Sequence, residues 1–216
     1  MGAEQQTAES LVNQQTAESL VRQAISYLAP KFNVSENSIP FPVVQPGKTG
    51  SYGKSGTIIL PVGAFNTEYV CGEETGHHIH RKVNPSVMES TFDNNPEFVD
   101  FMKMRNLIEL VGCYAGLAYA KFRGEETGLM RAEFKVVYHM LFDKNKNSAL
   151  SNKSSADALK ELPFYNKDIV QHVFGNYFAA RVFEELGDSL LPDLARAKSL
   201  EDAMTLVEKA GIDCSK

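Results

Sequence analysis

The sequence predicts an α+β protein that is mostly helical, with a small antiparallel β-sheet packed against a helix of residues 67–83. Segments of β-type composition gather only between residues 33 and 65, whereas the remaining chain spaces its apolar residues as helices do. The chain has 216 residues, of which 43% are hydrophobic, so it can bury a sizeable core in a single domain.

The composition limits the classes of partner. A net charge of −5 argues against a general nucleic-acid binder, because such proteins carry a basic surface. The first residues do not follow the pattern of a signal peptide, and the apolar stretches are too short to span a membrane. Three widely spaced cysteines without a CxxC pair are typical of a reducing compartment: Cys71, Cys113 and Cys214. We expect a soluble cytoplasmic protein without nucleic-acid or membrane partners, and the oligomeric state stays open.

A direct repeat opens the chain, because QQTAESLV occurs at residues 5–12 and again at residues 14–21. Its nine-residue period turns a helix by about 180°, so Leu11 and Leu20 would face opposite sides. Only the second copy continues into an amphipathic helix. We therefore expect residues 1–20 to be a flexible extension and residues 21–216 to form one domain.

The β-type region begins with residues 39–44, where Pro40 and Pro42 favour an edge strand. Residues 57–61 form the clearest strand. The glycine- and lysine-rich segment between them does not fit a phosphate-binding loop, because the required first glycine falls on Lys48 and a strand follows. A hairpin with a mobile basic tip is the better interpretation.

The helix of residues 67–83, between Asn66 and Asn84-Pro85, carries the densest group of reactive side chains. At about 100° per residue, Glu73, His77 and His80 fall within an arc about 60° wide. This arc should face the interior, because it also holds Tyr69, Val70, Gly76, Ile79 and Val83. The opposite side should hold Cys71, Thr75, His78 and Lys82. Buried carboxylates and imidazoles must be paired or bound to metal, so the arc predicts either a metal site or a hydrogen-bonded core network.

Further helices are expected over about residues 95–123, over residues 128–142, after Asn166 and from Ser199, with a surface loop at residues 143–165. Residues 107–120 are apolar enough to be the buried central helix. Their single charge, Glu109, either pairs with Arg105 or joins the metal site. His172 shares a helix face with Ile169, Val173 and Gly175, which favours a buried structural histidine.

The expected elements are, in order, a helix, a hairpin ending in Thr57-Ile58-Ile59-Leu60-Pro61, a helix with Glu73-Glu74-Thr75-Gly76-His77-His78, and a buried helix with one glutamate. This order resembles that of the gluzincin metallopeptidases, in particular the mini-gluzincins. The resemblance covers about residues 20–123. In that family the helix carries HExxH, and a glutamate of a later helix completes the zinc site. Glu74 and His77 match the motif, whereas Glu73 stands where the family has histidine.

The resemblance implies a zincin-like domain over residues 21–216 that acts as a metal-dependent peptidase or other hydrolase. Its metal ligands would be Glu73, His77 and Glu109. Glu74 would be the general base on a metal-bound water, and His172 is a second candidate catalytic residue. The cofactor would be zinc, with manganese or iron as alternatives, and a peptide or protein substrate would lie along residues 57–61.

The chemistry explains this spacing, because residues i and i+4 of a helix can meet one ion while the glutamate between them takes a proton. A carboxylate in place of the first imidazole adds negative charge, which favours manganese or iron. Three hypotheses stay open: a zincin-type metallopeptidase, an inactive binding or scaffold protein of that fold, and a non-peptidase metalloenzyme with iron or manganese bound by His and Glu.

Overall fold

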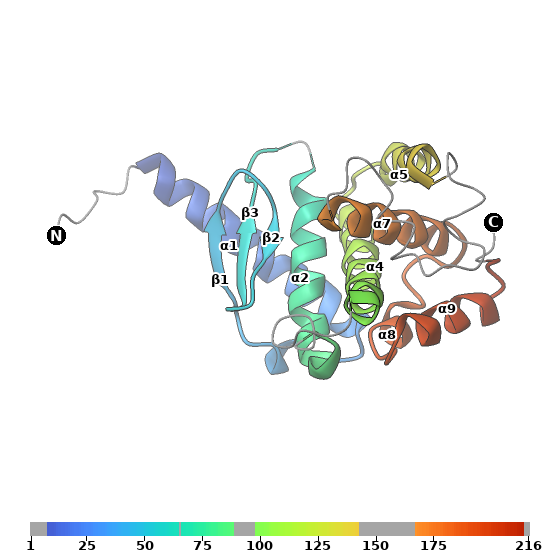
Figure 1. Cartoon of the computed structure of the whole chain (residues 1–216). Coiled ribbons are helices and arrows are strands. Elements are labelled where there is room, and N and C mark those ends of the chain that lie inside the picture. The colour runs from blue at the N-terminus through green and yellow to red at the C-terminus, as the bar shows by residue number, and fades with distance from the viewer. Residues whose placement is uncertain (1–7, 65, 89–97, 143–166, 214–216) are drawn as a thin grey trace.

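The computed structural model describes residues 8–64, 66–88, 98–142 and 167–213. The elements follow one another as α1 (Ala8–Lys31), the short 3-10 helix η1 (Glu36–Ser38), β1 (Val43–Pro46), β2 (Ser51–Tyr52), β3 (Thr57–Leu60), α2 (Thr67–Val83), α4 (Phe98–Phe122), α5 (Thr127–Phe142), α7 (Lys167–Leu186), α8 (Leu191–Leu194) and α9 (Leu200–Lys209) (Figure 1). The predicted class, α+β with mostly helices, is confirmed.

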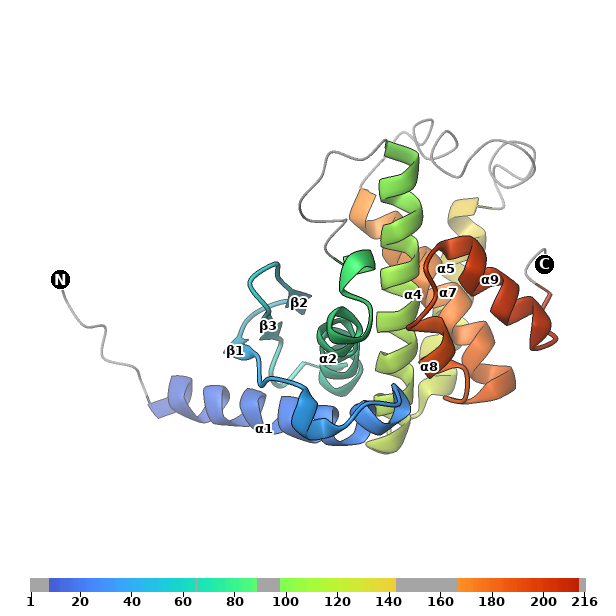
Figure 2. The ribbon, with the colours of Figure 1, turned by 90° about the horizontal axis from the view of Figure 1, so that it is seen from below.

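The elements form layers on both sides of α2. The sheet and α1 lie on one side, and α1 runs along the edge of both the sheet and α2 (Figure 2). On the other side α2 packs along α4, which in turn packs along α7. Helix α5 rests on α7, and α8 and α9 pack against α4. Helices α2, α4 and α7 therefore lie side by side and form the centre of the protein.

The sheet has the strand order β1-β3-β2, with β1 parallel and β2 antiparallel to the central β3. It is therefore mixed, whereas a wholly antiparallel sheet was predicted. The difference arises because the chain crosses over β3 after β1. A Cβ atom on Gly47 would lie 2.2 Å from Cγ2 of Ile59, which shows how closely the crossover passes. The predicted hairpin between residues 39–44 and residues 57–61 was wrong, because β1 runs parallel to β3. The antiparallel hairpin is formed instead by β2 and β3, and Gly56 takes a φ of +79° in its turn.

Helix α2 has the predicted bounds but is buried on nearly every side. Cys71, Thr75 and His78 were expected to point outward, and all three are buried. The expectation was wrong because α4 covers one side of α2 while α1 and the sheet cover the other. His78, for example, lies with Nε2 2.7 Å from the carbonyl oxygen of Pro40. Lys82 is exposed, as expected.

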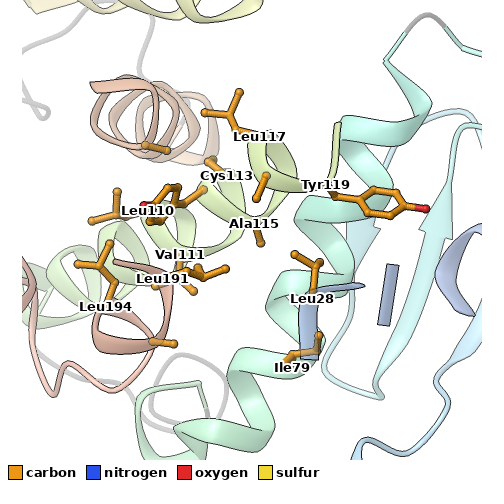
Figure 3. Close-up of a cluster of buried hydrophobic side chains, with 14 of the residues drawn as sticks. Leu28, Ile79, Leu110, Val111, Cys113, Ala115, Leu117, Tyr119, Leu191 and Leu194 are labelled. Carbon is orange, nitrogen blue, oxygen red and sulfur yellow. The ribbon is translucent and has the colours of Figure 1, made fainter. Parts of the chain in front are cut away.

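The hydrophobic core is centred on α4, whose residues 107–120 are buried as predicted. Side chains from α1, α2 and α8 converge on it (Figure 3), and they include Leu28, Ile79, Leu191 and Leu194. At the end of the chain, Ser199 caps α9 by accepting a hydrogen bond from the amide of Asp202.

Helix α1 runs through residue 20, the boundary that the repeat suggested for the extension. The second copy of the repeat packs on the protein, since Ala17 is buried and the side-chain amide of Gln14 donates a 2.7 Å hydrogen bond to the carbonyl of Val44. In the first copy Leu11 and Val12 are exposed. Some predicted segments lie outside the described residues: residues 1–7, the start of the helix predicted over about residues 95–123, the loop at residues 143–165 and Asn166.

Candidate metal centre

Two glycines bring the central helices close together. A Cβ atom on Gly112 of α4 would lie 2.3 Å from Cε1 of His77, so the imidazole of α2 lies directly on this glycine. A Cβ atom on Gly175 of α7 would lie 2.8 Å from the Cβ of Glu109. Packed carbon atoms normally stay about 3.5–4.0 Å apart, so larger residues would push these helices away from each other. Side chains of α2, α4 and α7 can therefore meet.

Four ligand-type side chains converge where the three helices meet. Glu73 comes from α2, Glu109 and Cys113 come from α4, and His172 comes from α7. One ligand atom from each lies within 4.8 Å of the other three. Carboxylate oxygen, thiolate sulfur and imidazole nitrogen are the atoms that bind divalent transition metals in proteins. The protein thus contains a group that could hold a metal ion, which we call the helix cluster.

Glu109 is at the centre of the helix cluster and lies beside three basic side chains. Its Oε2 lies 3.0 Å from Nδ1 of His172 and 3.7 Å from Nε2 of His77, and its Oε1 lies 3.4 Å from Arg105. Burial opposes ionisation of Glu109, but the pairing with His172 and the charges around it lower its pKa to about 2. Glu109 therefore pairs with Arg105 and also lies beside His77, and its role as a metal ligand stays a prediction.

His172 joins the helix cluster from α7. Its Nδ1 also lies 3.6 Å from Oε1 of Glu73, and the pairing with Glu109 and Glu73 raises its pKa to about 11. Its side chain is 45% exposed. The expectation of a buried structural histidine was wrong, because α7 turns this face toward the carboxylates of α2 and α4 and leaves part of the ring open to solvent.

Cys113 was not selected by the sequence analysis. Its thiol is buried and donates a 3.3 Å hydrogen bond to Oε1 of Glu73, and burial raises its pKa well above the usual value. A signal was available, since Cys113 follows Glu109 by four residues and therefore lies on the same face of α4. A lone cysteine is nevertheless a weak signal, because buried cysteines are common in cores.

Glu74 and His77 face a small cavity of about 120 Å³ beside the helix cluster. The described lining residues are Gly50, Ser51, Tyr52, Glu74, His77, Met88, Arg105, Ile108, Glu109 and His172. Burial, together with the nearby charges of Glu73 and Glu109, raises the pKa of Glu74 well above the usual value. Burial lowers the pKa of His77, so its ring is neutral and able to bind a cation.

His80 does not join the helix cluster, although it shares the predicted arc with Glu73 and His77. It is completely buried near the C-terminal end of α2, and burial lowers its pKa to about 3. Of the three polar side chains on the predicted arc, Glu73 and His77 therefore lie at the site, whereas His80 lies in the core.

The strand beside the cavity is β2, not β3. Because β3 is the central strand, β1 and β2 occupy both of its edges. A peptide cannot pair along residues 57–61 without displacing one of them. Ser51 and Tyr52 of β2 line the cavity, and the ring of Tyr52 lies nearly parallel to that of His77 with 6.5 Å between centroids.

The donor set fits a divalent metal ion. Three carboxylates are buried here, at 7% exposure for Glu73, 6% for Glu74 and 2% for Glu109. Arg105 and the protonated His172 are the basic side chains beside them and offset two of the carboxylates, while burial raises the pKa of the third, Glu74. Among the described residues, Nδ1 of His77 is buried without a hydrogen-bond partner, whereas Oε2 of Glu109 already lies 3.0 Å from Nδ1 of His172. A divalent cation could take the place of the proton on His172 and bind the ligand atoms of the helix cluster.

Comparison with protein-family models, with curated proteins and with solved structures found no match. The site is therefore assigned from its own geometry. Among the described residues, none of the helices is both long and apolar enough to cross a lipid bilayer.

Proposed function

We propose that this protein is a metal-dependent hydrolase that cleaves peptide bonds in the manner of the zincins. The observation that supports the proposal is the convergence of Glu73, Glu109, Cys113 and His172 within 4.8 Å, directly beside a cavity lined by Glu74. Glu73, Glu109 and His172 would hold the ion, with Cys113 and His77 at its sides. This ligand set differs from the one that the resemblance to gluzincins implies, because His172 takes the place of His77.

A divalent ion at this position would supply Lewis acidity toward a carbonyl oxygen and activate water as a nucleophile. Glu74 lines the cavity and would then accept the proton from that water. The neutral ring of His77 and the guanidinium of Arg105 border the same cavity and would orient the reacting carbonyl group. The small volume of the cavity would exclude bulk solvent from the reaction.

The edge of β2 provides a place for a peptide to bind. An extended peptide can add to an exposed strand edge through backbone hydrogen bonds. Here the edge strand also lines the cavity, through Ser51 and Tyr52, so a peptide on β2 would pass beside Glu74 and His77. We therefore propose β2, in place of residues 57–61, as the strand along which a peptide substrate binds.

The proposal is tested by metal analysis of protein purified without a histidine tag, followed by a peptidase assay on casein and on short peptides. We expect bound metal in the wild type and loss of metal in Glu73→Gln. The exposed Glu208→Gln on α9 is the matched control and should keep the wild-type metal content. Glu73→His restores the HExxH pattern and should increase both zinc affinity and cleavage. A folded, zinc-loaded Glu73→His protein that cleaves no substrate would contradict the peptidase proposal and favour a binding or scaffold role.

A second candidate is a non-peptidase iron or manganese protein. It is favoured by the approach of His77 and His172 to the same oxygen of Glu109, because two histidines and one carboxylate are the donor set of non-haem iron sites. Metal analysis after growth with iron, manganese or zinc distinguishes the candidates. Preferential retention of iron or manganese, without peptidase activity in any metal form, would favour this second function.

A further inference from the structure

A second and much larger cavity borders the helix cluster at Glu73. It has a volume of about 900 Å³, and we call it the α5 chamber. The described lining residues are Asn66, Tyr69, Val70, Glu73, Glu125, Glu126, Leu129, Met130, Ala132, Glu133, Phe134, Val136 and Asn176. Glu73 lines the α5 chamber and His172 lines the small cavity, and their polar atoms are 3.6 Å apart. Both cavities therefore border the helix cluster.

The α5 chamber lies between α5, which packs on α7, and the first half of α2, since residues of both α5 and α2 line it. Tyr69 spans part of this space, since its ring lies 5.7 Å from that of Phe134 and its hydroxyl donates a 2.5 Å hydrogen bond to Asn176. These contacts fix the wall of the chamber beside Glu73. A volume of this size is in the range of ordinary ligand sites.

The walls of the α5 chamber are mainly apolar. Leu129 is 79% exposed and Val136 is 56% exposed, and both lie on the face of α5 that borders the chamber. Met130 and Phe134 of α5 and Val70 of α2 continue this apolar surface toward Glu73. Large exposed apolar surfaces of this kind mark binding sites, because burying them against a ligand removes them from water.

The polar side chains of the α5 chamber are strongly biased in charge. The described residues that line the chamber include no lysine, arginine or histidine. They include four glutamates: Glu73, Glu125, Glu126 and Glu133. Burial and the neighbouring Glu68 raise the pKa of Glu125 to about 7, which reflects the crowding of carboxylates at this rim. An anionic ligand, such as a fatty acid, would be repelled here, whereas a positively charged one would be attracted.

We propose that the α5 chamber binds a peptide segment that combines bulky apolar side chains with lysine or arginine. The apolar side chains would contact Leu129, Met130 and Phe134, and the basic side chains would lie at Glu126 and Glu133. That this peptide is also a substrate of the helix cluster rests on the proposed function. Binding of the peptide to the chamber requires neither a metal ion nor cleavage.

The experiment measures binding of short fluorescent peptides to the metal-free full-length chain by fluorescence anisotropy. A leucine–lysine peptide should bind, and peptides that replace lysine by glutamate or leucine by glycine should bind at least about tenfold more weakly. Leu129→Ser should weaken the leucine–lysine peptide about tenfold. Val43→Ser is the matched control, because Val43 is 60% exposed on β1, far from the chamber, and this variant should bind like the wild type.

Charge is tested separately with Glu126→Lys, which should weaken binding of the leucine–lysine peptide severalfold and make it less sensitive to salt. Glu208→Lys on α9 is the control and should change neither property. Equal binding of the leucine–glutamate peptide, or no effect of Leu129→Ser, would overturn the proposal. So would displacement of the peptide by an equal concentration of a simple alkylamine, since the chamber would then take any cationic amphiphile.

The outcomes also separate this inference from the proposed function. Peptide binding that follows the chamber variants, without cleavage in any metal form, would contradict the hydrolase and support the chamber. Cleavage that is unchanged by Leu129→Ser and Glu126→Lys would support the hydrolase and contradict the chamber.

Discussion

His172 and Glu109 join α7 to α4 at the centre of the helix cluster, with Nδ1 of the histidine 3.0 Å from Oε2 of the glutamate. The proton on His172 balances one carboxylate that would otherwise lie buried among like charges. A metal ion would take over this role. The same pair therefore connects the stability of the metal-free protein to its ability to bind metal.

The first prediction concerns this pair. Glu109→Gln should lower the free energy of unfolding of the metal-free protein by about 1–3 kcal/mol, because His172 and Arg105 lose their charged partner. It should also abolish metal binding. The control is Glu201→Gln, which removes a surface pair with Lys103 and should cost less than about 1 kcal/mol. Chemical denaturation and metal analysis give both results, and equal stability losses in the two variants would contradict the central role of Glu109.

The second prediction concerns the close approach of α2 and α4. Gly112→Ala should displace the ring of His77 and lower the free energy of unfolding by about 1–3 kcal/mol, because the new methyl group has no space. Metal affinity should fall as well. Gly128→Ala on α5 is the matched control, since a Cβ there meets no atom within 4 Å, and it should be neutral or slightly stabilising. Thermal melts of both variants, with and without metal, make the comparison.

The third prediction separates the two adjacent glutamates of α2. Glu74→Gln should keep its metal and lose peptidase activity by a factor of about 10²–10⁴, the usual contribution of a general base. Glu73→Gln should lose the metal itself. If Glu74→Gln retained full activity while binding metal normally, Glu74 would not be the base, and another group of the small cavity would have to accept the proton.

The fourth prediction concerns pH. Burial lowers the pKa of His80 to about 3, so the folded protein is more stable when this ring is neutral than when it is protonated. This contribution is complete above the unfolded pKa of about 6.5 and is lost as the pH falls toward 3. Denaturation of the metal-free protein between pH 7 and pH 4 should show decreasing stability, with a smaller decrease in His80→Gln. His77 and His78 also have lowered pKa values, so some of the decrease should remain in the variant.

Local sequence signals predicted the elements that carry the site. Asn84-Pro85 ends α2 where expected, because proline restricts the residue before it. The apolar run around Glu109 indicated a buried helix with one charge in it, and α4 confirms this burial. The helical positions of Glu73 and His77 placed both on one face of α2. Each of these features depends on neighbours within a few residues, which is why the sequence alone was sufficient.

The partners of these residues depend on contacts between segments that are far apart in the chain. His172 lies 63 positions after Glu109, and its face was assigned to the core because helical spacing cannot tell which neighbour a face meets. The parallel pairing of β1 with β3 depends on a crossover that no strand pattern contains. The burial of Cys71 and His78 likewise depends on α1 and the sheet, which enclose α2 on its second side.

The sequence by itself determined the α+β class, the bounds of α2 and the presence of carboxylates and imidazoles on a buried helix. Only the tertiary structure decided that Cys113 and His172 join them, that His80 does not, and that one cavity borders the cluster at His172 and another at Glu73. The physical reason is that periodicity and capping are local properties of the chain. A metal centre instead requires ligand atoms within a few ångströms of one another, and here the close packing of α2, α4 and α7 at Gly112 and Gly175 brings them together.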